Sequence, residues 1–237
     1  MTREGVILGR KLFFEPLMSG NNRIACASCH HQDKAFTDGI SLTSIGFSGN
    51  RLHRNTQAII NLAWVTNGLF WDGGSTNLES LAIGPITHLD EMGQNILELP
   101  QKLAQTGNYT LLFENAFPAE KEEGITTQKI LKALGQYLRT VISADSRYDK
   151  YILGQLSLSD TEQRGLRVFD SKCSSCHRRD KHLFTDNLYH NIGLESAFSE
   201  ANERTEQGRY RITFNPDDMG KFRTPTLRNL SYTAPYM

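Results

Sequence analysis

Cys26-Ala27-Ser28-Cys29-His30 and Cys173-Ser174-Ser175-Cys176-His177 are two copies of one pattern, Cys-x-x-Cys-His. The pattern is typical of c-type haem attachment. Two thiols add to the two vinyl groups of one porphyrin, and the histidine that follows ligates the iron. All four cysteines of the chain lie in these copies, so none is left for a disulfide. The sequence therefore predicts two covalent haem c groups, with His30 and His177 as iron ligands.

Two other chemistries of paired cysteines explain less of the pattern. A structural zinc ion could take its four ligands from two Cys-x-x-Cys pairs. Zinc does not explain the histidine after each pair, because adjacent residues rarely bind one tetrahedral ion. A thioredoxin-like redox pair needs a surrounding pattern of strand and helix that is absent here. Haem attachment is the favoured interpretation.

Composition excludes several classes of protein. The chain has 237 residues, with 26 basic and 26 acidic side chains, so no basic field points to nucleic acid. No apolar run is long enough to span a bilayer. The segment from Met1 to Arg10 does not have the pattern of a signal peptide. Covalent haem attachment takes place outside the bacterial cytoplasmic membrane, so we expect a periplasmic protein whose leader is absent from this chain.

A weak internal repeat surrounds the two motifs. Leu12-Phe13-Phe14 precedes the first motif, and Phe36-Thr37-Asp38-Gly39 follows it. Val168-Phe169 and Phe184-Thr185-Asp186-Asn187 take the same places around the second motif. The repeat predicts two related lobes, each beginning with a short helix whose aromatic residues pack on a porphyrin.

The fold is expected to be mainly α, with two cytochrome c-like lobes at residues 1–145 and 146–237 and long irregular loops. Apolar residues recur at helical spacing from Ile130 to Val141, after Thr126-Thr127 as the N-cap. Ser159 and Glu162 form a capping-box signature for the helix that leads to Phe169. The segment from Asp145 to Ser159 is interpreted as the link between the lobes.

With these motifs in place, the chain resembles the family of the bacterial di-haem cytochrome c peroxidases and MauG along nearly its whole length. Besides the two haem motifs, the matching segments are Leu8–Phe14, Arg54–Thr56, Phe70–Gly73, Gly84-Pro85, Glu91-Met92, Phe184–Asn187, Thr224–Asn229 and Thr233–Met237.

The resemblance implies an enzyme that reacts with hydrogen peroxide. It makes His30 the ligand of the peroxidatic haem and His177 the ligand of the haem that relays electrons. The electrons would come from a small donor protein, a cytochrome c or a cupredoxin. A homodimer is compatible with the resemblance.

The same resemblance implies roles for three residues near the first haem. Glu91 matches the distal acid–base residue, because peroxide must lose a proton from one oxygen and gain one on the other. Pro85 would wall the distal pocket, and Trp71 matches a tryptophan that passes electrons between the haems. The ordinary interpretations are a solvated loop carboxylate for Glu91 and a buried core aromatic for Trp71.

Asn55, Thr233 and Pro235 match the residues of a calcium site in the family. An asparagine side chain and backbone carbonyls suit this hard, oxygen-seeking ion. The ordinary interpretation is a turn asparagine with loop carbonyls. We therefore expect a calcium ion beside the two haems.

The chain departs from the family pattern near the first haem. Phe47 stands where classical members carry a histidine that caps the resting iron, and Leu81 stands where many carry a distal glutamine. Phenylalanine cannot ligate iron, and the alternative His53 lies beside the calcium segment. We therefore expect a five-coordinate first haem, as in MauG.

A second departure concerns the sixth ligand of the second iron. In the family this ligand lies in a segment beyond the position of Met237. Met219 and Met237 are local candidates, but neither matches the family position, and both are interpreted as structural.

The remaining histidines receive simpler interpretations. His31 is expected to be exposed, and His88 to lie on a loop surface near Glu91. His182 and His190 flank the Phe184 motif and are candidates for contact with a haem propionate.

Three functions stay open at this point. The first is a peroxidase in which electrons pass from the second haem to the first. The second is a MauG-like enzyme that uses peroxide to oxidise residues of a partner protein. The third is a di-haem electron carrier without catalysis.

Overall fold

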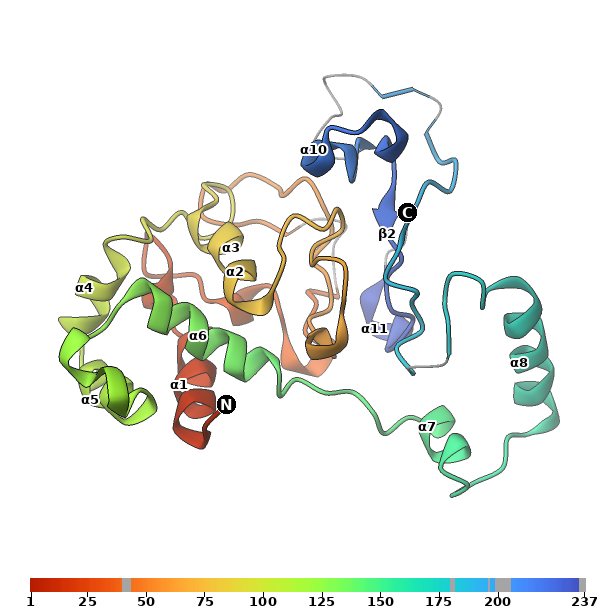
Figure 1. The fold of residues 1–237 in the computed structure, drawn as a ribbon, viewed down its shortest axis with the longest axis horizontal. Helices are drawn as coiled ribbons and strands as arrows, with labels where there is room; N and C mark the ends of the chain where they lie inside the picture. The colour runs from red at the N-terminus through yellow and green to blue at the C-terminus, as the bar shows by residue number, and fades with distance from the viewer. Residues whose placement is uncertain (40–43, 180–181, 196, 199–205, 235–237) are drawn as a thin grey trace. The chain divides into compact units, whose positions relative to one another are not determined.

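The computed structural model describes residues 1–39, 44–179, 182–195, 197–198 and 206–234. Helices predominate in this part of the chain (Figure 1), which confirms the expectation of a mainly α fold. The α-helices are α1 Arg3–Phe13, α2 Leu78–Leu81, α3 Ile83–Thr87, α4 Leu99–Ala104, α5 Tyr109–Ala116, α6 Thr127–Leu138, α7 Arg147–Ile152, α8 Asp160–Lys172, α10 Tyr210–Thr213 and α11 Leu230–Thr233. Short 3-10 turns lie between them, among them η2 Cys26–Ser28 and η5 Pro118–Glu123.

Two strands of two residues each form an antiparallel pair. They are β1 Tyr189–His190 and β2 Phe222–Arg223, with Tyr189 opposite Arg223.

The chain divides into two compact units. The first unit contains Met1–Trp64, Ser75–Val141 and the described part of Ser231–Met237; the second contains Val65–Gly74 and Ile142–Leu230. Val65–Gly74 therefore packs with the second half of the sequence, an arrangement that a single boundary after residue 145 does not describe. The segment from Asp145 to Ser159, interpreted above as the link between the lobes, lies in the second unit and contains α7, capped by Ser146.

The core of the first unit is built on α1 and α6, which lie side by side (Figure 1, red and green). Leu8 and Leu12 of α1 and Ala133 of α6 have no exposed surface. The predicted N-cap is confirmed, since the Thr126 hydroxyl accepts a hydrogen bond from the Lys129 amide. At the crossing, a Cβ on Gly9 would collide with the Ala133 carbonyl oxygen. The two helices can approach this closely only because residue 9 is glycine.

Gly9→Ala should therefore destabilise the protein by about 1–3 kcal/mol, because the extra methyl group forces the two helices apart. Gly165→Ala in α8 is the matched control, since open space surrounds that position. There the loss of a flexible helical glycine should stabilise by about 0.5–1 kcal/mol. Denaturant unfolding of both variants measures the difference, and equal effects of the two substitutions would contradict this packing.

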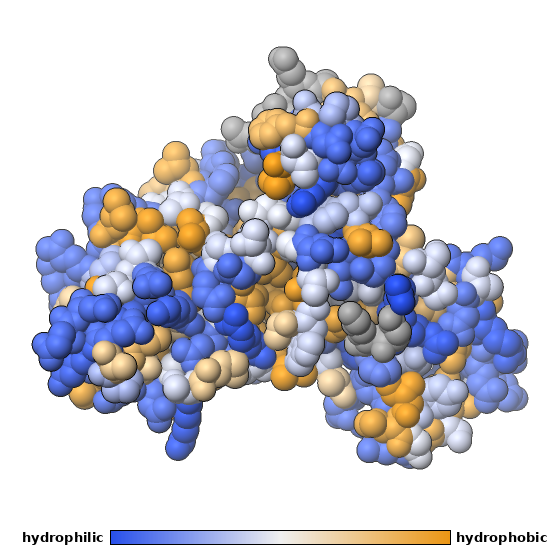
Figure 2. Space-filling model, viewed as in Figure 1, coloured by the Kyte–Doolittle hydropathy of each residue, from blue (hydrophilic) through white to orange (hydrophobic). Residues whose placement is uncertain are grey.

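The second unit has few buried apolar side chains. Among its described residues, the buried hydrophobic side chains are Leu69, Leu158 and Leu183. The predicted capping box of α8 is confirmed, with Ser159 and Glu162 exchanging hydrogen bonds, yet none of the residues of α8 is buried. Orange, hydrophobic side chains stand among blue ones on the surface in Figure 2, and Val168 of α8 is 60% exposed. The described side chains of this unit therefore supply little buried apolar surface for a unit of its size.

The helices described are too short, or too polar, to cross a lipid bilayer.

Candidate functional site

The first Cys-x-x-Cys-His motif folds into a single turn. Cys26 begins η2, and its carbonyl accepts a hydrogen bond from the His30 amide at 3.0 Å. The Nδ1 atom of His30 lies 2.7 Å from the Phe36 carbonyl oxygen. A carbonyl can only accept, so Nδ1 carries the proton and Nε2 keeps the lone pair that iron needs. Burial also lowers the pKa of His30, which favours the neutral imidazole.

The second motif repeats this geometry. The His177 amide donates to the Cys173 carbonyl at 2.9 Å, and Nδ1 of His177 donates to the Phe184 carbonyl at 2.9 Å. Phe36 and Phe184 both have a left-handed backbone, with φ of 58° and 55°. Residues other than glycine rarely adopt this backbone conformation. Its occurrence at both positions therefore shows that the two loops have the same backbone geometry.

The repeat extends further than the sequence pattern indicated. The Thr37 hydroxyl donates to the Thr56 carbonyl at 2.8 Å, and the Thr185 hydroxyl donates to the Thr224 carbonyl at 2.6 Å. Each hydroxyl ties the loop after a haem motif to a segment distant in the sequence. Five residues after Thr56 and Thr224, respectively, Asn61 and Asn229 both have a left-handed backbone. The signal in the sequence is a threonine followed by asparagine at the same interval, which is too weak to identify alone.

The aromatic residues before each motif lie against these loops. The Phe13 and Phe36 rings meet edge to face with centroids 6.0 Å apart, and Phe13 lies 6.5 Å from the His30 ring. The Phe169 and Phe184 rings meet in the same way at 5.9 Å. Each candidate iron ligand therefore has an aromatic cluster beside it.

These residues fit covalent haem. Each unit offers two thiols, an imidazole whose Nδ1 donates to a backbone carbonyl, and neighbouring aromatic rings. The second unit also lacks an apolar core of its own among its described residues, and a porphyrin would supply apolar surface there. Cys26, Cys29 and His30 would hold one haem, and Cys173, Cys176 and His177 the other.

Glu91 lies on a loop that is held by several backbone hydrogen bonds. The Met92 amide donates to the Pro85 carbonyl at 3.1 Å, and the Met92 carbonyl accepts from the Gly20 amide at 2.8 Å. Gly20 belongs to the segment that leads into the first haem motif. Pro85 lies in α3 and is half-buried, so its carbonyl helps to set the start of the Glu91 loop.

The electrostatic surroundings of Glu91 favour its neutral form. Burial raises the pKa of the Glu91 carboxyl, His88 opposes this rise, and Asp90 adds to it. The Glu91 charge in turn contributes to the raised pKa values of the thiols of Cys26 and Cys29, for which burial is the main cause. Glu91 therefore shares an electrostatic environment with the first haem motif. A half-buried carboxyl with a raised pKa is suited to proton transfer.

Trp71 belongs to the second unit rather than to the first. Its carbonyl accepts a hydrogen bond from the Arg223 amide at 2.8 Å, and the Phe70 carbonyl accepts from Arg223 Nε at 3.2 Å. Phe70 has a left-handed backbone, with φ of 65°. The segment that carries Trp71 is thus attached to β2, and its ring is half-buried.

A family model described as "Di-haem cytochrome c peroxidase" matches residues 3–157. The chain belongs to the di-haem cytochrome c peroxidase family. Within the family, it is 34% identical over 244 residues to the methylamine utilization protein MauG of Methylorubrum extorquens. It is 31% identical over 232 residues to the cytochrome c551 peroxidase of Pseudomonas aeruginosa.

The alignments cover nearly the whole chain but not the whole of each relative. The match to MauG takes in 100% of this chain and 65% of MauG, and the match to the c551 peroxidase takes in 97% and 66%. This member of the family therefore spans about two thirds of the length of these curated relatives.

Solved structures of family members have the same fold. A MauG-like protein associated with microbial copper homeostasis superposes with a TM-score of 0.87 at 35% identity, over 100% of this chain and 72% of that one. The diheme peroxidase BthA from Burkholderia thailandensis superposes with a TM-score of 0.85 at 26% identity, over 100% and 68%.

The candidate calcium residues of this family member are partly described. Asn55 and Thr233 are half-buried and belong to the first unit. Pro235 lies outside the described residues, as does Met237.

The other histidines have defined surroundings. His31 is expected from the sequence to be exposed but is half-buried, and its backbone pairs with Thr37 in an isolated bridge. His88 is exposed, as expected, and its Nδ1 accepts from the Asp90 amide at 3.2 Å. His190 Nε2 lies 2.7 Å from an Asp186 carboxylate oxygen, and potential ligand atoms of Cys176, Asp186 and His190 lie within 4.8 Å of one another. Cys176 is one of the haem-attachment thiols, so this group belongs to the second haem site.

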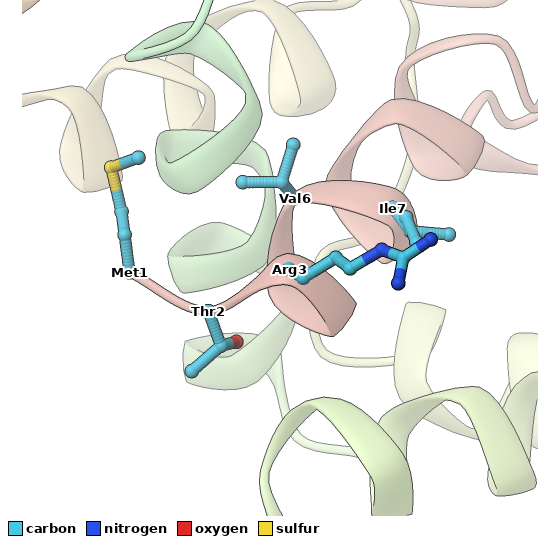
Figure 3. Close-up of a pocket in the computed structure, with 5 residues that line it drawn as sticks. All are labelled: Met1, Thr2, Arg3, Val6 and Ile7. Atoms are coloured by element: carbon cyan, nitrogen blue, oxygen red, sulfur yellow. The ribbon is translucent and has the colours of Figure 1, made fainter.

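A surface hollow at the N-terminus lies apart from these residues. Figure 3 shows that Met1, Thr2, Arg3, Val6 and Ile7 line it. It contains no cysteine, histidine or carboxylate and is not a candidate catalytic site.

Proposed function

We propose that this protein is a di-haem c-type oxidoreductase that reduces hydrogen peroxide. The observation that supports the proposal is the half-buried Glu91 carboxyl with its raised pKa. Its loop is hydrogen-bonded, through Met92 and Gly20, to the segment that precedes the first haem motif. When bound at His30, the first haem would supply an iron at which the O–O bond is broken.

Glu91 would move the proton that this chemistry requires. As a carboxylate it takes a proton from one oxygen of the peroxide, and as a carboxylic acid it returns that proton to the other oxygen. Two electrons and two protons then convert one hydrogen peroxide to two waters. The raised pKa of Glu91 brings its two protonation states closer in free energy, which suits a group that must both accept and donate.

The second unit would receive the electrons. We propose that a small cytochrome c or a cupredoxin delivers them to the haem held by His177, and that Trp71 relays them to the first haem. The attachment of Trp71 to β2 of the second unit supports this role. We further propose a periplasmic location, and a calcium ion held by Asn55, Thr233 and Pro235.

A second candidate function is MauG-like oxidation of residues in a partner protein. The observation that favours it is Phe47, which stands where classical members carry a ligating histidine. An iron without that ligand would meet peroxide without prior reduction. A di-haem electron carrier is the remaining alternative, and it requires both irons to be saturated.

Stoichiometric peroxide added to the oxidised protein separates these functions. The denatured protein should first show the mass of the chain plus two haems. We expect a five-coordinate signal in the resting spectrum, and a rapid change in haem absorption on adding peroxide without any reductant. Turnover only with a reduced donor protein would support the peroxidase, and oxidation of a partner protein would support the MauG-like function. Two six-coordinate haems with no spectral change would leave only the carrier.

A further inference from the structure

Residues 44–52, here the Phe47 loop, are closed into a short hairpin. Ile45 and Arg51 pair in an isolated antiparallel bridge, and the Leu52 amide donates to the Ser44 carbonyl at 2.9 Å. At its base Ser44 is buried, and its hydroxyl donates to the Asp38 carboxylate at 2.6 Å. The base of the loop is therefore anchored to the segment that follows the first haem motif.

The tip of the Phe47 loop lies against residues 88–94, here the Glu91 loop. The Phe47 amide donates to the carbonyl oxygen of Glu91 itself at 2.7 Å. A Cβ on Gly46 would collide with the Asp90 carbonyl oxygen, so the two backbones are in close contact. A Cβ on Gly93 would overlap the Phe47 ring. The Phe47 side chain thus packs on the Glu91 loop.

The Asp90 side chain connects the two loops from outside. Its Oδ1 atom accepts from the Ser48 hydroxyl at 2.7 Å and from the Asn50 side-chain amide at 3.2 Å. The Ser48 hydroxyl oxygen also accepts a hydrogen bond from the backbone amide of Asn50 at 3.1 Å. This bond orients the Ser48 hydroxyl and the Asn50 side chain toward the Asp90 carboxylate. These bonds hold the pKa of Asp90 below its ordinary value, with smaller contributions from His88 and His53. Asp90 is therefore a carboxylate at neutral pH and a steady acceptor.

We propose that Asp90 is a positioning residue, which holds the Phe47 loop on the Glu91 loop and thereby fixes where the Glu91 carboxyl lies. Removal of the Ser48 and Asn50 bonds frees the tip of the Phe47 loop and weakens the bond from the Phe47 amide to Glu91. The neighbour of Asp90 in the chain is Glu91, so the disturbance reaches the proton-transfer group directly. The kinetic part of this inference rests on the proposed function of Glu91.

Two substitutions of Asp90 distinguish the effect of the hydrogen bonds that its side chain accepts from the effect of its negative charge. Asp90→Asn keeps an acceptor oxygen for Ser48 and Asn50, whereas Asp90→Ala removes it. Both abolish a negative charge that raises the pKa of Glu91. The other titratable groups near Glu91 are His88 on its own loop and the sulfurs of Cys26 and Cys29, which no longer titrate once bonded to haem.

The holoprotein is tested by the rate of its reaction with hydrogen peroxide across pH. Asp90→Ala should lower the plateau rate about tenfold, while Asp90→Asn stays within about twofold of wild type, because misplacement of a catalytic group is costly. The acid limb of the rate profile should move to lower pH in both variants. The double variant Ser48→Ala, Asn50→Ala should reproduce the lower plateau while keeping the wild-type acid limb. Asp218→Ala is the matched control, since it removes a surface carboxylate bonded to the Thr213 hydroxyl in the second unit; its rate should not change.

Hydrogen exchange at the Phe47 amide tests the same inference without using activity. Exchange should be faster in Asp90→Ala and in the double variant, and unchanged in Asp90→Asn and Asp218→Ala. Unchanged exchange and an unchanged plateau in Asp90→Ala would overturn the positioning role of Asp90 while leaving Glu91 in place. A wild-type protein inert to peroxide would instead overturn the proposed function, and the exchange result would still decide whether Asp90 holds the loops together.

Discussion

Glu91→Gln should lower the rate of the peroxide reaction by about 10²–10⁴-fold while leaving both haems attached, which is the loss typical of a missing proton-transfer group. The amide of glutamine has nearly the shape of the carboxyl but neither accepts nor returns the proton. Because the Met92 and Gly20 backbone bonds that hold the loop do not involve the Glu91 side chain, the substitution should not disturb the loop. Stopped-flow absorption of the oxidised protein mixed with peroxide measures the rate.

The control for this substitution is Glu98→Gln. Glu98 is an exposed carboxylate of the same unit, seven residues further along, bonded to the side-chain amide of Asn95 at 2.7 Å. Its substitution should leave the rate unchanged. Near-normal turnover in Glu91→Gln, with the haem spectrum intact, would remove Glu91 from the mechanism.

The pH profile gives a second readout for Glu91. A group that accepts a proton is active only when deprotonated, so the rate should fall as the pH drops through its pKa. Burial raises the pKa of Glu91, so the fall should begin above the ordinary range for glutamate, which is about 4.3. This acid limb should be absent from the residual activity of Glu91→Gln.

Arg228→Leu should destabilise the second unit by about 3–5 kcal/mol, the cost of leaving one partner of a buried ion pair unpaired. Both guanidinium NH groups of Arg228 contact the Asp149 carboxylate, at 2.9 Å and 2.6 Å. The two side chains are 6% and 7% exposed. Arg228 Nε also donates to the His182 carbonyl at 2.7 Å, so one side chain joins α7 to the loop after the second haem motif. Chemical unfolding of the holoprotein measures the loss.

The control for Arg228 is Arg147→Leu. Arg147 makes a similar two-point contact with Glu162, but it is 62% exposed. An exposed pair contributes only about 0–1 kcal/mol. Asp149→Asn introduced into Arg228→Leu should recover part of the stability, because it removes the unpaired charge. Equal losses in Arg228→Leu and Arg147→Leu would contradict the assigned role of burial.

The same ion pair predicts how stability depends on pH. The hydrogen bonds that Asp149 accepts from Arg228, and further ones from the Ser146 hydroxyl and backbone amide, hold the pKa of Asp149 well below its ordinary value. A carboxyl with a depressed pKa in the folded state contributes its full stability above its unfolded pKa of about 3.9 and loses it as the pH falls below that value. Arg228→Leu should therefore flatten the decline of stability that the wild-type protein shows as the pH falls below about 4.

Several features could be predicted from the sequence because local chemistry decides them. The spacing of two cysteines and a histidine is set by one porphyrin, and it holds wherever the segment lies. The Thr126 cap and the Ser159 capping box depend on atoms a few residues apart, and both are confirmed. The sequence did not indicate α7 within Asp145 to Ser159, because this helix is short and has too few apolar residues to show a period.

Other features needed the folded chain because distant residues make them. The amino-acid sequence alone determined two haem-attachment motifs, two related loops and the family, since each is a contiguous run of residues. Only the tertiary structure decided that Trp71 packs with the second unit and that Asp149 meets Arg228, 79 residues away. It also brought Ser48 and Asn50 to Asp90, and the Phe47 amide to the Glu91 carbonyl. Such contacts form when burial and backbone hydrogen bonding fold the chain back on itself, and no local pattern of residues records them.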